Sequence, residues 1–226
     1  MSNKSMYFGS ENVVETLKEG LNPSLTGISK EQRFGSGFYF FHRDNDAQNE
    51  IGLQGLNVVH PVVMSAEVAL VNPVRIKSGQ TTIHDAFISV SPQQILQIMH
   101  HNERIFDSVF SPLLDWKEEN HNRISEELIN EVCEHFSKPE HFWSMEKALF
   151  GDLGEAKFFR EAVYNVVGYD GVIVELENGK ENMVAWFSEQ VSNMEIHKVL
   201  PKPEIETTHQ RSPEPVAPEL RLSRSH

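Results

Sequence analysis

Short hydrophobic runs separated by turn residues occupy about the first hundred positions of the chain, a pattern typical of β-strands. Residues 38–41 are four aromatics that follow a Gly-Ser-Gly turn, and residues 62–71 form a β-rich run that ends at an Asn-Pro turn. Residues 74–76 are expected to resume the sheet. Residues 13–20 predict one short amphipathic helix that stops at its glycine.

The middle of the chain carries apolar residues at the three- and four-residue spacing of amphipathic helices. Ser91-Pro92 supplies an N-cap and a first-turn proline to one helix, and Ser125 caps a second. A third helix is expected to stop at Gly168. A largely helical block is therefore predicted at about residues 91–167.

Two further β-rich runs follow this block, at residues 172–174 and 183–187. Asn178-Gly179 lies between them, and this pair supplies the positive φ angles that a tight hairpin turn requires. Strands, a helical block and strands again predict an α+β protein in which the helices form an insertion in a β core.

The composition changes at residue 200. Residues 200–226 contain five of the eleven prolines, few apolar side chains, and four acidic residues balanced by four basic ones. Such a segment buries too little apolar surface to offset the entropy of ordering it, so we predict a disordered tail after one domain at residues 1–199.

Charge and composition narrow the classes of function. The chain has 226 residues and a net charge of −13, which disfavours binding to a phosphate backbone. It has neither a secretory signal nor an apolar run near the ~20 residues of a membrane-spanning helix, so a soluble cytoplasmic protein is expected. Cys133 is the sole cysteine, so no intramolecular disulfide can form. It is predicted to be buried as a small hydrophobic side chain.

Common catalytic and metal-binding patterns are missing from the sequence. It contains no phosphate-binding GxxxxGK[ST] loop, no GxGxxG, no HExxH and no GxSxG. Several histidines of the helical block lack a carboxylate partner at ligand spacing, so solvated or capping histidines are predicted and no metal site is expected. These histidines are His100, His101, His121, His135 and His141.

Four short stretches carry more information together than separately. They are residues 6–10 (MYFGS), 35–40 (GSGFYF), 61–73 (PVVMSAEVALVNP), and 168–173 (GYDGVI) followed by 182–191 (NMVAWFSEQV). Their order and content resemble the ADP-ribosyltransferase superfamily, especially the compact domains of bacterial effectors, polymorphic toxins and polyvalent phage proteins. The resemblance covers about residues 6–198, with the helical block as an insertion.

The resemblance implies a split β core that holds NAD as a substrate and transfers its ADP-ribose with release of nicotinamide. By this match Tyr39 stacks on the nicotinamide, Gly9 presents its backbone to the carboxamide, and Ser10 hydrogen-bonds nearby. Gly35 and Gly37 let the backbone approach the dinucleotide. Breaking the nicotinamide–ribose bond develops positive charge on the ribose, which explains why such a site uses an aromatic wall and a carboxylate.

Two positions depart from the family's pattern. Phe8, in the stretch matched to the cofactor site, stands where the family has a histidine that holds the adenine-side ribose. Asn182 stands eight residues before Gln190, where the family has its catalytic glutamate. Glu181 is its neighbour, and adjacent side chains of a strand point to opposite faces, so only a bulge would bring Glu181 into the site. Both residues therefore stand with Tyr39 as catalytic candidates.

The same residues have simpler interpretations. The aromatics at positions 8 and 38–41 are typical of a β-domain core, and Glu181 and Asn182 of an ordinary hairpin. Asp170 is predicted to form a turn rather than to act as an acid.

Three functions follow from these observations. The leading expectation is an NAD-dependent mono-ADP-ribosyltransferase that modifies a protein, of the effector or toxin type that is delivered into a host or competitor cell. The alternative is a catalytically degenerate domain of this fold that acts by binding a partner protein. The third is transfer of ADP-ribose to a small molecule or a nucleic acid, and the net charge of −13 makes nucleic acid the least favoured acceptor. The oligomeric state is left open.

Overall fold

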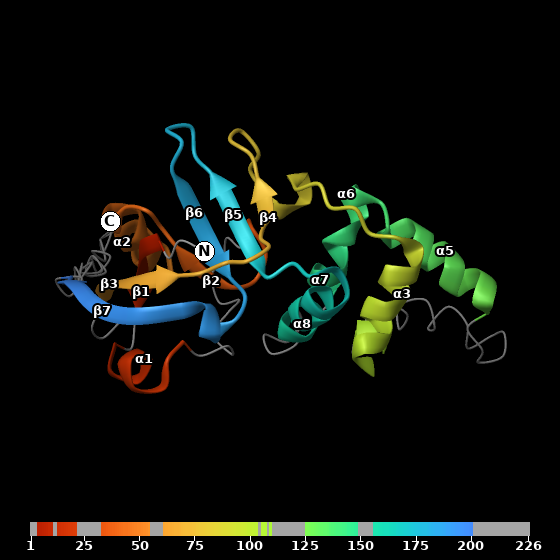
Figure 1. Cartoon of the computed structure of the whole chain (residues 1–226), viewed down its shortest axis with the longest axis horizontal. Helices are drawn as coiled ribbons and strands as arrows, with labels where there is room; N and C mark the ends of the chain where they lie inside the picture. The colour runs from red at the N-terminus through yellow and green to blue at the C-terminus, as the bar shows by residue number, and fades with distance from the viewer. Residues whose placement is uncertain are drawn as a thin grey trace, which may run out of the picture.

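The protein has an α+β fold, as the sequence predicts (Figure 1). The computed structural model describes residues 4–10, 13–21, 33–54, 61–103, 105–107, 109, 125–148 and 156–200. His121 and the predicted tail beyond Leu200 lie outside these ranges. In the described residues no helix is both long enough and apolar enough to cross a membrane.

The strands form two sheets. The first has the order β1-β3-β7 and is antiparallel throughout. The second has the order β2-β6-β5-β4, in which β4 and β5 are parallel and the other pairs antiparallel. The strands are β1 (Lys4–Ser10), β2 (Phe38–Phe40), β3 (Val62–Val68), β4 (Val74–Ile76), β5 (Gly171–Glu175), β6 (Glu181–Ala185) and β7 (Val191–Val199).

One β-bridge joins the two sheets within the described residues. Tyr7 and Phe41 exchange both backbone hydrogen bonds, with N···O distances of 2.8 and 2.7 Å. The pairing goes no further, so β1 and β2 separate beyond this bridge. The β core is therefore split between these two strands.

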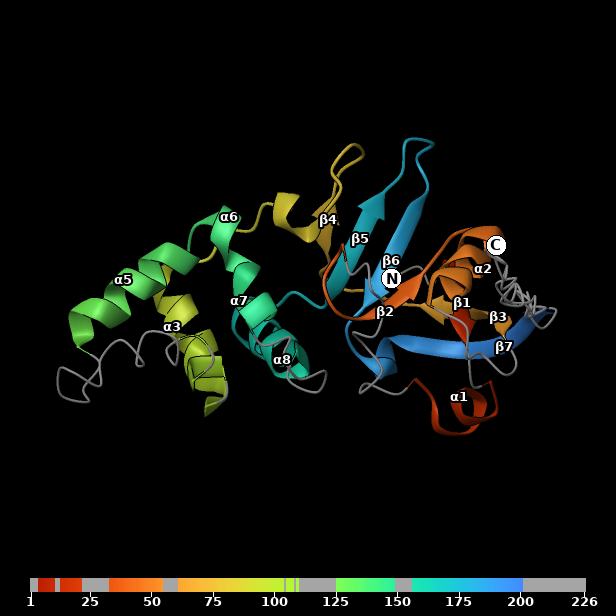
Figure 2. The same cartoon turned by 180° about the vertical axis from the view of Figure 1, so that it is seen from behind.

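The named helices of the insertion pack together beside the four-stranded sheet (Figures 1 and 2). They are α3 (Pro92–His101), α5 (Glu126–Phe136), α6 (Pro139–Phe142), α7 (Ser144–Ala148) and α8 (Ala156–Val167). The helices α1 (Val13–Glu19) and α2 (Asp44–Gln54) lie near the other sheet. Among the described residues the 3₁₀ turns are η2 (Ile83–Asp85) and η3 (Ser188–Gln190).

The predicted helix ends are confirmed. The Ser91 and Ser125 hydroxyls accept hydrogen bonds from backbone N–H groups in the first turns of α3 and α5, at 3.3 and 3.2 Å. Gly20 and Gly168 end α1 and α8 with φ angles of +82° and +88°. Cys133 is buried in the helical core, and burial raises the pKa of its thiol.

The predicted hairpin exists, but its turn differs from the expected one. Of the pair Asn178-Gly179 only the glycine has a positive φ angle, +72°. Gly179 N–H donates to the Leu176 carbonyl at 2.9 Å and Leu176 N–H donates to the Lys180 carbonyl at 2.8 Å. This makes a longer hairpin loop with one left-handed glycine, in place of a two-residue Asn-Gly turn.

Alternate residues of β5 and β6 belong to two different cores. Those that face the helical block are Val172, Val174 and Val184, and those that face the three-stranded sheet are Ile173, Met183 and Ala185. The four-stranded sheet is therefore covered on both faces, and the face on which a residue lies decides its surroundings.

Candidate functional site

The strand register divides the predicted site residues between two faces of the sheet. Phe40 lies opposite Met183, and both belong to the core between the two sheets. Tyr39 and Asn182 therefore lie on the other face, the one that carries Val184.

The first motif divides in the same way. Phe8 and Ser10 are buried on the face between the two sheets, and the Phe8 ring packs edge-on against Phe40 with centroids 5.2 Å apart. The Ser10 hydroxyl lies 3.1 Å from the Thr16 hydroxyl of α1. Gly9, between them, lies on the opposite face of the three-stranded sheet, which carries Tyr7 and Val63 and packs against Ala47 of α2.

The Tyr39 ring is half-buried against the core of the helical block. Its hydroxyl donates to the Gly35 carbonyl at 2.6 Å and accepts from the Phe34 N–H at 3.3 Å. Tyr39 is thus tied to the turn that precedes its own strand.

Asn182 contacts the chain just beyond the aromatic strand. Its Oδ1 accepts a hydrogen bond from the backbone N–H of His42 at 3.1 Å. Because His42 follows the Tyr7–Phe41 bridge by one residue, Asn182 lies close to the point where the two sheets meet.

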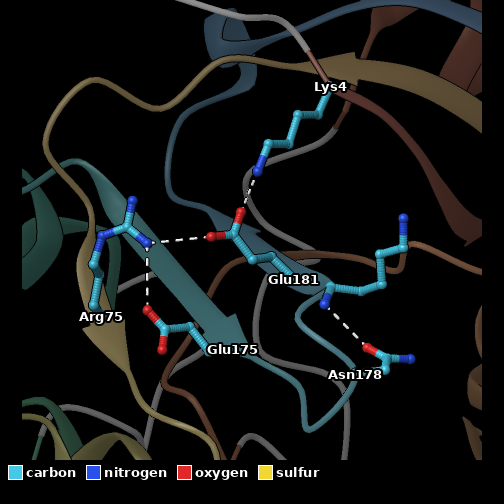
Figure 3. Close-up of polar contacts among 6 residues, drawn as sticks. Lys4, Arg75, Glu175, Asn178 and Glu181 are labelled. Carbon is cyan, nitrogen blue, oxygen red and sulfur yellow. Dashed lines mark hydrogen bonds and ion pairs between the residues drawn. The ribbon is translucent and has the colours of Figure 1, made fainter.

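Glu181 lies in a network of charged residues that joins both sheets (Figure 3). Its carboxylate contacts the Lys4 ammonium of β1 and accepts from Arg75 Nη1 of β4 at 3.2 Å. Arg75 also lies 3.6 Å from Glu175. The hydrogen bond from Lys4 is the main cause that lowers the pKa of Glu181, and Arg75 acts in the same direction.

No bulge brings Glu181 to the Tyr39 face. The register of β5 with β6 runs without a shift from Gly171–Ala185 to Glu175–Glu181. Glu181 and Asn182 consequently point to opposite faces, and Asn182 is the one that shares a face with Tyr39.

Protein atoms lie against both glycines of the Gly-Ser-Gly turn. Gly35 has φ +80°, and a Cβ at this residue would lie 3.0 Å from Glu146 Oε2. A Cβ at Gly37 would lie 2.4 Å from Val184 Cγ1 and 2.8 Å from the Ala185 carbonyl oxygen. In this structure the glycines allow the turn to approach α7 and β6.

The fourth motif contributes side chains that hydrogen-bond to backbone groups of other segments. The buried Asp170 carboxylate accepts from the backbone N–H groups of Val71 and Asn72, at 2.6 and 3.0 Å. It therefore holds a segment distant in the sequence, whereas the sequence predicts a local turn former. These bonds also explain why β3 ends at Val68 and not at residue 71.

Gln190 links the residues after β6 to Asp170. Its side-chain oxygen accepts from the N–H groups of Trp186 and Phe187, both at 2.9 Å, and its Nε2 donates to the Asp170 carbonyl at 2.7 Å. The predicted strand at residues 183–187 therefore ends at Ala185.

Sequence reasoning missed one polar cluster. Ser36, Glu146 and Arg160 are 0%, 3% and 2% exposed, and Glu146 Oε1 accepts from both the N–H and the hydroxyl of Ser36. The available signal was an arginine within the apolar face of α8, between Phe159 and Ala162.

Within the described ranges, no group of three or more His, Cys, Asp and Glu side chains could hold a metal ion. His135 and His141 stack on one another, with centroids 4.0 Å and planes 10° apart. Burial lowers the pKa of His135, and the nearby His141 and Lys138 lower it further.

Comparisons with known proteins add little to this description. No family model matches the chain, and no curated protein matches it significantly. Among solved structures it is similar to one described as the crystal structure of an anti-CRISPR protein, with 11% identity over 88% of this chain and 96% of that one. The TM-score is 0.26, so this likeness supports no statement about fold or function.

Proposed function

We propose that this chain is an NAD-dependent mono-ADP-ribosyltransferase that modifies a protein, with its site where β1 and β2 separate, next to Gly9, Tyr39 and Asn182. One observation carries the proposal. The two strands that bear the first and second motifs are joined by the single Tyr7–Phe41 bridge and then separate. Counted from the bridge along the two strands, Gly9 and Tyr39 are each two positions away, so they lie on the two sides of the split.

Each of these residues has a role in the proposed reaction. The Tyr39 ring stacks on nicotinamide, and the Gly9 backbone holds the carboxamide. The bond between the nicotinamide nitrogen and ribose C1 breaks, and nicotinamide leaves with the electron pair. A nucleophile of the acceptor protein then bonds to C1 and releases its proton to solvent. Asn182 orients a ribose hydroxyl and supplies no charge, so turnover is expected to be slow.

The alternative function is a degenerate domain that binds a partner protein without catalysis. It is favoured by the hydrogen bonds that already engage the polar side-chain atoms of the site. The Tyr39 hydroxyl donates to Gly35, and the Asn182 oxygen accepts from His42. The two functions differ in whether NAD binds and whether nicotinamide is released.

NAD binding is the first test. Calorimetric titration should give binding to the wild type and a loss of about 1–3 kcal/mol in Tyr39→Ala, the scale of a lost aromatic stacking partner. Tyr39→Phe keeps the ring and should bind nearly as well, whereas Tyr164→Ala removes a half-exposed tyrosine of α8 as a control. Equal affinities for wild type and Tyr39→Ala would show that Tyr39 does not line the site.

Nicotinamide release with a mixture of acceptor proteins tests catalysis. Asn182→Ala should lower the rate by about 100-fold, the scale of one lost transition-state contact, and Glu181→Ala should change it little because Glu181 lies on the opposite face. A silent wild type with an active Asn182→Glu variant would identify the natural protein as the degenerate domain.

A further inference from the structure

The buried polar cluster of Ser36, Glu146 and Arg160 joins the candidate site to the helical block. Ser36 belongs to the turn before β2, Glu146 to α7 and Arg160 to α8. All three side chains are at least nine-tenths buried, so the cluster is shielded from water.

The contacts within the cluster are directed at the turn. Glu146 Oε1 accepts from the Ser36 N–H at 3.1 Å and also from the Ser36 hydroxyl. At Gly35 a side chain would lie 3.0 Å from both Glu146 Oε2 and Ile83 Cδ1, and the φ angle of +80° also favours glycine. The Gly-Ser segment is thus shaped to rest on one carboxylate.

Glu146 and Arg160 are buried groups of opposite charge, and each affects the pKa of the other. Burial raises the pKa of Glu146, whereas the Ser36 hydrogen bonds and the positive charge of Arg160 act against this rise. Burial lowers the pKa of Arg160, and the negative charge of Glu146 opposes that shift. Because burial disfavours the charged form of both groups, the Glu146 carboxylate is stabilised by the two Ser36 donors and by the positive charge of Arg160.

The same turn holds Tyr39. Gly35, at which an added Cβ would lie 3.0 Å from Glu146 Oε2, accepts a hydrogen bond from the Tyr39 hydroxyl with its carbonyl at 2.6 Å. Phe34 on the other side donates its N–H to that hydroxyl at 3.3 Å. The position of the phenol ring therefore depends on where the turn rests, and the turn rests on Glu146.

We propose that Glu146 is a positioning residue: it fixes the Gly35–Ser36 segment, and through it the Tyr39 ring, in the orientation that receives the nicotinamide. This inference rests on the proposed function, because the orientation of the Tyr39 ring matters for function only if that ring stacks on nicotinamide. It also assigns a role to the helical insertion, which brings Glu146 and Arg160 to the site from outside the β core.

The first measurement follows Tyr39 without NAD. The chain has four tyrosines, so ring signals of a ¹³C-tyrosine-labelled protein are assigned by comparison with Tyr39→Phe. Ser36→Ala and Glu146→Gln should shift or broaden the Tyr39 signals and leave those of Tyr7 unchanged. Ser89→Ala and Glu134→Gln, which change exposed side chains, are the matched controls and should alter neither. Ser36→Ala keeps both charges, so it reports on the turn even if Glu146→Gln fails to fold.

The second measurement is NAD affinity in the same variants. Ser36→Ala and Glu146→Gln should bind NAD on the order of tenfold more weakly than the wild type, the scale of losing a group that orients a site residue. Unmoved Tyr39 signals, or moved signals with unchanged affinity, overturn the positioning role while the proposed function stands. No NAD binding by the wild type overturns the proposed function and the positioning role with it.

Discussion

Gly37 offers a sharp test of how the Gly-Ser-Gly turn packs. An added methyl group in Gly37→Ala would lie 2.4 Å from Val184 Cγ1 and 2.8 Å from the Ala185 carbonyl oxygen. The carbonyl belongs to β6, which is hydrogen-bonded on both sides and cannot shift alone. Overpacking of this kind costs about 1–3 kcal/mol, and a backbone conformation open mainly to glycine adds about 1–3 kcal/mol. We therefore expect a loss of roughly 2–6 kcal/mol.

Gly79→Ala is the matched control. Gly79 also has a positive φ angle, +90°, but no atom lies within 4 Å of the position of its added Cβ. Its substitution should cost only the backbone strain, about 1–2 kcal/mol. In a chain of this length 1 kcal/mol corresponds to about 2–4 °C, so Gly37→Ala should lower the melting temperature on the order of 10 °C and Gly79→Ala by about 2–8 °C.

Thermal unfolding followed by circular dichroism, with NAD titration of the folded variants, tests whether Gly37 is required for packing or for ligand contact. Equal melting temperatures for the two variants would refute the packing argument. A Gly37→Ala protein with wild-type stability and no NAD binding would instead support the ligand-contacting role that the sequence resemblance implies for this glycine.

Two further predictions concern the polar residues of the motifs. Asp170→Ala leaves the Val71 and Asn72 N–H groups without their acceptor, so urea unfolding should show a loss of about 1–3 kcal/mol, with a smaller loss in Asp170→Asn; wild-type stability in both would contradict the bracing role. Glu181 has a lowered pKa in the folded state, so it stabilises the fold above its unfolded pKa of about 4.3 and this contribution disappears as pH falls through the folded pKa. Wild type should therefore exceed Glu181→Gln by less than about 1 kcal/mol at pH 7 and match it near pH 2, and a difference independent of pH would exclude the ionic origin.

Most of the secondary structure could be predicted because local chemistry determines it. Serine caps, glycine stops and runs of β-branched residues set helix and strand ends within a few residues of those observed, as at Ser91, Ser125 and Gly168. The helix at Asp44–Gln54 was missed because it has almost no apolar stripe. Asp44 and Asp46 in its first turn favour a helix N-terminus, but such a signal is weak without periodicity.

The site was harder to predict because its geometry depends on contacts between distant segments. Glu146 lies 110 positions from Ser36, and nothing in the pattern around it distinguishes a buried carboxylate from a solvated one. The ends of β3 and β6 were placed too late for the same reason: backbone groups that looked like strand are bound by the Asp170 and Gln190 side chains.

The choice between Glu181 and Asn182 shows how a count along the sequence acquires a physical meaning. Gln190 is fixed to the end of β6 by two backbone N–H groups, and β6 then alternates without a bulge back to its first residue. The side chain eight positions before Gln190 must therefore lie on the same face as Tyr39. In this chain that side chain is the amide of Asn182. Any transfer of ADP-ribose at this face must proceed without a carboxylate from β6, because the nearest one, Glu181, is directed to the other face and paired with Lys4 and Arg75. It follows that Asn182→Glu places a negative charge beside Tyr39 without changing the strand. A rise in nicotinamide release in that variant would measure the contribution of the carboxylate that the natural site lacks.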